Sequence, residues 1–254
     1  MQALLCERCG YDLSGSPAGG VCPECELPVS ESLPERRTGT AWQQAWIGAK
    51  TRLPQAWLLS TVRGLFTPGA QLRRATIVAR GARGLLWINL LIASTVLTLQ
   101  SAPTVAALTV SYWPSWLTSP AVALGPTWRY GAVLLTLALW ALLLRFLVGV
   151  ERFGIHFYAA RRFWRIGSVL SLLGTSHASG AWIVAALGAR MLPIATEGLA
   201  RILPPSLAVK VAGIQVIAPA LGFISGMIWF EIATYFALRA CRYGNHPGVH
   251  RPDA

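Results

Sequence analysis

The chain has 254 residues, of which 54% are hydrophobic and only 13% are charged, and its net charge is +12. Soluble domains of this size carry about a quarter charged residues, so this composition, with a mean hydropathy of +0.50, argues against a soluble globular domain. The basic balance favours nucleic acid or an anionic membrane surface as a partner, and the position of the charges decides between them.

Two cysteine pairs stand near the N-terminus, in the stretch CERCGYDLSGSPAGGVCPEC. Two CxxC pairs at this spacing can close a tetrahedral site around Zn²⁺, because each tight turn supplies two thiolates. A ribbon of about twenty residues cannot build a useful apolar core, so the metal would supply most of its folding free energy. We expect a structural zinc site whose ligands are Cys6, Cys9, Cys22 and Cys25. Two disulfides are the alternative, and they would require an exported N-terminus.

The charge of this N-terminal region bears on its partner. Residues 1–35 contain six acidic residues against Arg8 alone, a net charge of −5. A Zn(Cys)4 centre adds about −2. Because binding to phosphate requires the opposite sign, the sequence disfavours nucleic acid and favours a protein partner or packing within the chain.

The sequence CERCGYDL followed by CPEC resembles the N-terminal zinc ribbon of a group of bacterial predicted membrane proteins. The resemblance covers about 25 residues of the chain. It implies the same four cysteine ligands and supplies no activity. We expect an integral membrane protein, located in the inner membrane if the protein is bacterial.

An amphipathic helix is expected in residues 51–83. Leu53, Trp57, Val62 and Phe66 recur at helical spacing beside basic residues, which is typical of an amphipathic helix at a membrane surface. Packing of that helix on other protein is the alternative.

The chain is expected to divide into five segments. These are a zinc ribbon at 1–28, a linker at 29–50, an amphipathic and basic membrane-surface segment at 51–83, a transmembrane bundle at 84–240 and a cytoplasmic tail at 241–254.

Four apolar runs are long enough to cross a hydrocarbon core of about 30 Å. They are residues 84–102, 130–150, 166–187 and 211–238. The last run is longer than one perpendicular span needs, and Pro219 and Gly222 lie inside it. One tilted, kinked helix is our first choice there, and two short spans, five in all, are the alternative. The predicted fold class is therefore an all-α membrane helix bundle with a small zinc ribbon.

Basic residues set the expected orientation. Many of them precede the first span, only Arg129 lies in the connection 103–129, and four arginines lie in the connection 151–165. These regions alternate between inside and outside, so four spans place both termini in the cytoplasm. A reducing compartment also suits cysteines that must stay reduced to bind metal.

Three polar residues lie within the apolar runs, namely His177, Gln215 and Glu231. Ionisable groups inside a membrane are costly, so each is a candidate for function, and hydrogen bonds between helices are the alternative. A hydrogen bond between His177 and Glu231 is possible if their helices pack. Pairs of small residues such as Gly222 and Gly226 would allow close helix packing or self-association into a homo-oligomer.

The sequence contains no HExxH, GxSxG, paired-aspartate or Walker pattern, so we expect no enzymatic activity. Our first hypothesis is a non-enzymatic multi-pass membrane protein with a docking, scaffold or membrane-organising role. Its layout resembles that of the Yip family of membrane-organising proteins over residues 50–240, although that family usually has one span more. The alternative is a small transporter or channel subunit that uses the three intramembrane polar residues. Cys241 is either a free thiol or an acylation site.

Overall fold

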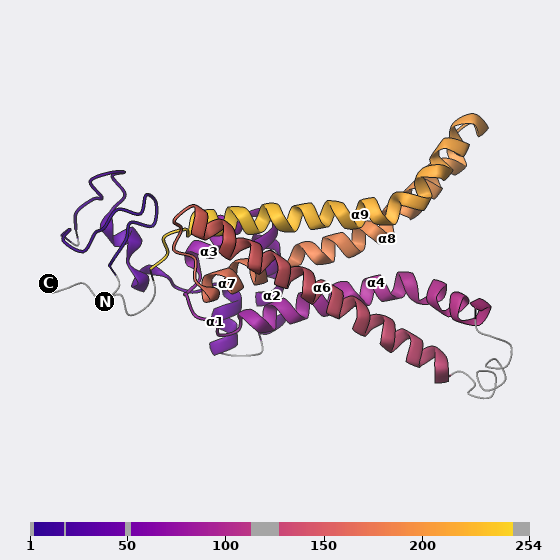
Figure 1. Cartoon of the computed structure of the whole chain (residues 1–254), viewed down its shortest axis with the longest axis horizontal. Helices are drawn as coiled ribbons and strands as arrows, with labels where there is room; N and C mark the ends of the chain where they lie inside the picture. The colour runs from indigo at the N-terminus through magenta and orange to yellow at the C-terminus, as the bar shows by residue number, and fades with distance from the viewer. Residues whose placement is uncertain (1–2, 18, 49–51, 113–126, 246–254) are drawn as a thin grey trace. The chain divides into compact units, whose positions relative to one another are not determined.

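The computed structural model describes the chain except residues 1–2, 18, 49–51, 113–126 and 246–254 (Figure 1). The described residues form helices and no β-strand, with isolated bridges at Leu5–Asp12 and Val21–Pro28. The chain divides into two compact units. The first comprises residues 1–87, 148–180 and 229–254, and the second comprises residues 88–147 and 181–228.

Short helices follow the ribbon in the region that we predicted to be a linker. They are η1 (Val29–Ser32), η2 (Pro34–Arg36) and α1 (Ala41–Ile47). Thr40 begins α1 with a capping box, because its side chain accepts from the backbone N–H of Gln43 while the Gln43 side chain accepts from the backbone N–H of Thr40. Residues 29–50 are therefore largely structured where the chain is described.

The amphipathic segment forms α2 (Leu53–Phe66) and α3 (Pro68–Arg74). Several of its large apolar residues are exposed, Leu58 by 54% and Phe66 by 71%, whereas Leu53, Trp57 and Leu65 are half-buried. The opposite face of α2 carries small residues and packs on α7 (Ser168–Ala178). A Cβ at Gly64 would lie only 2.0 Å from the backbone oxygen of His177, so the helices touch there. An uncovered apolar face on α2 agrees with the predicted membrane contact.

Within the described residues, four helical segments are long and apolar enough to cross a membrane, as many as the sequence predicts. The first is α4 (Ala82–Tyr112) and the second is α6 (Thr127–Arg161). The third is formed by α7 and α8 (Gly180–Ile202), which are separated at Ser179. The fourth is α9 (Pro205–Ala240), one continuous helix that contains Pro219. The chain is therefore an integral membrane helix bundle, and the fourth apolar run is a single helix rather than two spans.

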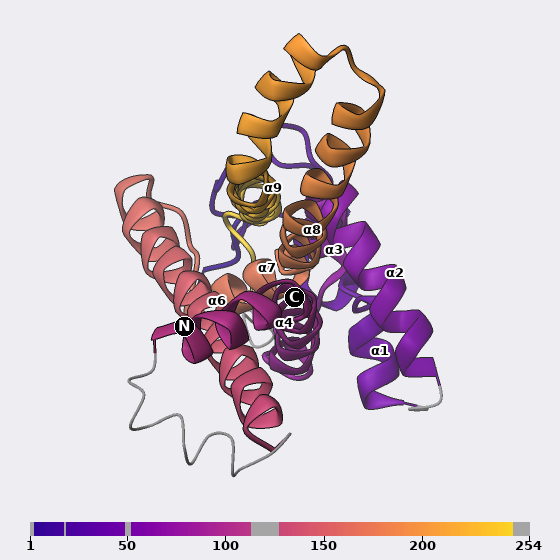
Figure 2. The ribbon, with the colours of Figure 1, turned by 90° about the vertical axis from the view of Figure 1, so that its right-hand side faces the viewer.

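Small residues bring α8 and α9 close together within the second unit, and Figures 1 and 2 both show the two helices side by side. A Cβ at Gly222 would lie 2.3 Å from the backbone of Gly188, and one at Gly226 would lie 2.3 Å from Ala185. The predicted GxxxG pair thus packs inside the unit. Homo-oligomer formation through such faces stays a prediction.

Candidate metal centre and its attachment to the helices

Cys6, Cys9, Cys22 and Cys25 gather at one point of the ribbon, as their spacing predicts. Their four Sγ atoms all lie within 4.8 Å of one another. The Sγ atoms of Cys6 and Cys25 are 3.5 Å apart, and so are those of Cys9 and Cys22. Four sulfurs around a zinc ion at the usual bond length lie about 3.8 Å apart. The cluster therefore has the size and the donor set that a tetrahedral metal site needs.

Each pair of cysteines lies on a tight turn of similar construction. Cys6 donates its N–H to Tyr11 and accepts from Gly10, while Cys22 donates to Leu27 and accepts from Glu26. Gly10 and Glu26 hold the same place in the two turns, with φ of 85° and 58°. Glycine adopts this left-handed conformation readily, whereas glutamate is strained there. The second turn therefore keeps the conformation of the first, although its sequence departs from the usual glycine.

The thiols of the cluster differ in how readily they ionise. Burial raises the pKa of Cys9 to about 12. Burial also opposes ionisation of Cys22, but hydrogen bonds from the backbone of Glu24 and Cys25 outweigh it and lower its pKa to about 7. Four thiolates cannot accumulate together in so small a space without a cation. A divalent metal ion would supply that charge and hold all four sulfurs deprotonated.

The ribbon has only a small apolar core of its own. Leu4, Leu13 and Val29 are buried together with Cys6 and Cys22. So few side chains bury too little surface to fold a segment of this size. The ribbon therefore depends on the metal site and on contacts with the helices.

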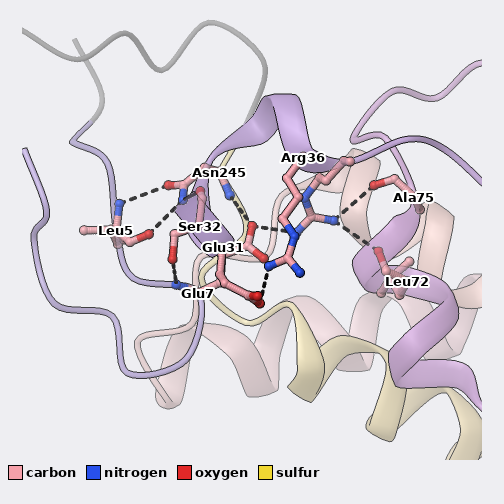
Figure 3. Close-up of polar contacts among 9 residues, drawn as sticks. Leu5, Glu7, Glu31, Ser32, Arg36, Leu72, Ala75 and Asn245 are labelled. Carbon is pink, nitrogen blue, oxygen red and sulfur yellow. Dashed lines mark hydrogen bonds and ion pairs between the residues drawn. The ribbon is translucent and has the colours of Figure 1, made fainter. Parts of the chain in front are cut away.

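A buried ion pair joins the ribbon to the rest of the first unit. The guanidinium of Arg37 lies 2.6 Å from the Glu7 carboxylate. The same guanidinium donates to the backbone oxygens of Leu72, at 3.1 Å, and Ala75, at 3.0 Å (Figure 3). Arg37 thus connects the first cysteine turn with the end of α3.

Asn245, beyond the end of α9, holds the ribbon from a second side (Figure 3). Its side-chain oxygen accepts from the N–H of Leu5 at 3.0 Å, and its amide donates to the backbone oxygens of Leu5 at 2.7 Å and Ser32 at 2.8 Å. The Asn245 side chain is fully buried. A residue 240 positions along the chain therefore completes the hydrogen bonding of the ribbon backbone.

Further residues near the helix ends add to this attachment. Arg165 donates to the backbone oxygen of Ala3 at 2.8 Å, and Arg242 donates to that of Arg8 at 2.5 Å. The Tyr243 ring lies so close to Gly10 that a Cβ there would be 2.8 Å from it. These contacts make the ribbon part of the first unit.

Cys241 is fully buried, and the charge of Arg37 acts on its thiol. Burial raises the pKa of the Cys241 thiol to about 11. A buried, protonated thiol is a poor nucleophile. The structure therefore places Cys241 as a packed side chain, which disfavours acylation in this folded state.

A basic pocket lies between the ribbon, α3 and the end of α9, with a volume of about 590 Å³. Its lining includes Arg8, Arg73, Arg239 and Arg242. The two glutamates in the lining, Glu7 and Glu31, are paired with Arg37 and Arg36. The pocket therefore carries positive charge next to the membrane-spanning helices.

The three intramembrane candidates do not form one site. His177 is buried at the end of α7, and its Nδ1 has no hydrogen-bond partner among the described residues. Gln215 is partly exposed and belongs to the second unit. Glu231 faces a pocket that His177 does not line. The possible hydrogen bond between His177 and Glu231 is absent from the described structure.

Glu231 instead lines a pocket together with Glu151, a residue that was not among the sequence candidates. Glu151 directly follows the predicted second span at 130–150, so it was read as part of a polar connection. Its helix α6 continues to Arg161, which brings the residue against α9. A glutamate directly after an apolar run was the only signal that the sequence offered.

Comparison with known proteins gives no match among family models, curated proteins or solved structures.

Proposed function

We propose that this chain is a non-enzymatic membrane scaffold in which a cytoplasmic Zn(Cys)4 ribbon joins both ends of the chain to the helix bundle. The clustering of four thiols within 4.8 Å carries this proposal. All four donors are cysteines, which is typical of structural rather than catalytic zinc. In this role Cys6, Cys9, Cys22 and Cys25 bind the metal. Arg37 and Asn245 attach the metal-bound ribbon to the helices.

The attachment of the ribbon supports a scaffold role. Arg37, Asn245 and Arg165 bind ribbon groups from three different parts of the chain. A metal ion that organises the ribbon would therefore also organise the segments that pack on it. The basic pocket beside α3 and α9 suits the anionic head groups of a cytoplasmic leaflet, and a membrane-organising role follows by analogy with the Yip layout.

We propose that exposed residues of the ribbon form a docking surface. Tyr11 and Val21 are apolar but 40% and 55% exposed. Asp12, Glu24 and Glu26 are exposed in the same small module. Apolar side chains with a charged rim are typical of a protein interface. The partner that fits is a protein with a basic surface, whereas nucleic acid is disfavoured by the negative charge.

Site-specific photo-crosslinking of the full-length protein in its native membrane tests the docking role. A photoreactive residue at Val21 should give one defined protein adduct, and the adduct should weaken in Asp12→Asn/Glu24→Gln/Glu26→Gln. The matched control is a photoreactive residue at Ile202, which is 79% exposed in the second unit and should give no such adduct. An adduct of the same yield in the charge variant as in the wild type would contradict docking through the ribbon.

The alternative function is a small transporter or channel subunit that uses His177, Gln215 and Glu231. One observation favours a part of it, namely the pocket that Glu231 and Glu151 both line. Loss of substrate uptake in Glu231→Gln, with the ribbon intact, would support transport. Unchanged uptake in Glu231→Gln would contradict the transport function and favour the scaffold function.

A further inference from the structure

A second pocket, of about 280 Å³, lies within the first unit where α6, the segment after it and α9 meet. Its polar and aromatic lining residues are Glu151, Tyr158, Trp164, Glu231, Thr234 and Tyr235. The remaining lining residues are apolar or glycine. The acidic groups thus stand in a largely apolar setting, where an interaction with a cation is stronger than in water.

The two carboxyl groups in this pocket come from different helices, since Glu151 belongs to α6 and Glu231 to α9. Two carboxylates that share one small pocket repel unless a proton or another cation lies between them. No basic residue lines the pocket in the described part of the chain. Arg152 donates to the Ser168 oxygen at 3.4 Å, and the guanidinium of Arg162 lies 5.5 Å from the centroid of the Tyr158 ring without lining the pocket. The pair therefore favours a positively charged ligand.

Thr234 supplies an independent sign of a ligand. Its side chain lines the pocket and is fully buried, and its hydroxyl has no hydrogen-bond partner among the described residues. A buried hydroxyl without a hydrogen-bond partner destabilises the folded state by about 1–3 kcal/mol. A ligand that hydrogen-bonds with the hydroxyl would remove this cost. Together with two carboxylates it makes three acceptors, which is the number that the three N–H donors of a primary ammonium require.

Three aromatic rings complete the wall of the pocket. The Trp164 ring lies 5.4 Å from the Tyr158 ring and 6.4 Å from the Tyr235 ring, between centroids. Faces of such rings attract a cation, most strongly when it is removed from water. We propose that this pocket binds the primary ammonium group of an organic amine, held by Glu151, Glu231 and the Thr234 hydroxyl.

Two kinds of molecule carry a primary ammonium group, namely a soluble amine and a phospholipid with an ethanolamine head group. Glu151 directly follows the apolar run 130–150, so a lipid head group can approach it as readily as a soluble molecule. The shared ammonium chemistry is what the pocket recognises. The proposal goes beyond the scaffold function, and its failure can be told apart from a failure of the zinc ribbon because none of the four cysteines lines the pocket.

The test uses the detergent-solubilised full-length protein and ethanolamine as the probe. Binding is followed by calorimetry and by the change in Trp fluorescence that Trp164→Phe removes. We expect Glu231→Gln to weaken binding about tenfold or more, because a charge-assisted hydrogen bond is lost. This variant also relieves carboxylate repulsion, so it should fold at least as well as the wild type. Thr234→Val should weaken ethanolamine binding but leave tetramethylammonium, which has no N–H, unchanged.

Glu197→Gln is the matched control, since it removes an exposed carboxylate of the second unit. It should bind ethanolamine like the wild type. Competition by phosphatidylethanolamine but not phosphatidylcholine in nanodiscs would identify a lipid head group as the source, and no competition would identify a soluble amine. The proposal is overturned if neither form binds, if Glu231→Gln and Glu197→Gln behave alike, or if Na⁺ or Mg²⁺ binds while amines do not.

Discussion

Arg37 and Glu7 form a buried ion pair between the first cysteine turn and the segment that leads into the helices. Their side chains are only 4% and 12% exposed. A buried charge whose partner is removed is left uncompensated, which is far more costly than the loss of a surface pair. The pair is therefore a sensitive probe of whether the ribbon is bound to the helices.

Arg37→Met should destabilise the attachment of the ribbon by about 3–5 kcal/mol, because Glu7 loses its partner within a largely buried site. The measurement is the urea concentration at which Cys241, buried beside Arg37, becomes open to alkylation. Arg36→Met is the control, since its pair with Glu31 is half exposed, and it should cost at most about 1 kcal/mol. Equal effects of the two substitutions would show that Arg37 does not hold the ribbon.

Asn245→Ala should loosen the ribbon from the end of α9 by about 2–4 kcal/mol, because it leaves buried backbone groups of Leu5 and Ser32 without partners. Limited proteolysis of the detergent-solubilised protein should then cut within residues 1–40 faster than in the wild type. Asn245→Asp keeps one acceptor for the Leu5 N–H but removes the donors, so it should not restore protection. Unchanged cleavage of both variants would refute the contact.

Cys241 gives a prediction for the dependence of stability on pH. Its pKa is raised by burial from 9.0 to about 11. The folded state therefore holds the thiol proton more tightly than the unfolded state does. The resulting contribution is fully present below about pH 9 and is lost as the pH rises through about 11. Cys241→Ala should lack this fall, so the difference in unfolding free energy between wild type and variant should shrink by about 2–3 kcal/mol over that window.

Parallel curves for the wild type and Cys241→Ala between pH 8 and 11 would contradict that account. Taking the difference between the two proteins removes contributions of the other cysteines, which are common to both. Slow alkylation of Cys241 at pH 8 is the companion expectation, because the protonated thiol is buried.

Close packing of α8 on α9 predicts a contrast between two glycines of one helix. Gly226→Val should destabilise the second unit by about 1–3 kcal/mol or more, because even a Cβ there would meet Ala185 at 2.3 Å. Gly213→Ala should be neutral or slightly stabilising, since nothing lies within 4 Å of that position. Thermal unfolding in detergent measures both. A tolerated Gly226→Val would show that the helices are farther apart.

The helices of the bundle could be predicted because their signal is local. Four long apolar runs give four spans, and the two CxxC pairs give the cysteine cluster. The helix α1 also had a local signal, the capping box of Thr40 and Gln43, which our reading of residues 29–50 as a linker missed.

The attachment of the ribbon could not be predicted from the sequence. Asn245 donates a hydrogen bond to Leu5, 240 positions away, and Arg165 donates one to the backbone oxygen of Ala3. Every residue has a backbone oxygen, so the sequence does not mark these acceptors. The meeting of Glu151 and Glu231 in one pocket likewise depends on how α6 and α9 align. Such contacts are set by tertiary packing rather than by periodicity or motif.

Metal content of the purified, detergent-solubilised protein tests the central claim most directly. Wild type and Cys241→Ser, which alters a buried cysteine outside the cluster, should each contain one zinc per chain. Cys22→Ser should lose the zinc, and its ribbon should become sensitive to protease. Absence of metal from the wild type, with cysteines that resist alkylation until they are reduced, would instead mean disulfides and would contradict both the structural zinc ribbon and its cytoplasmic location.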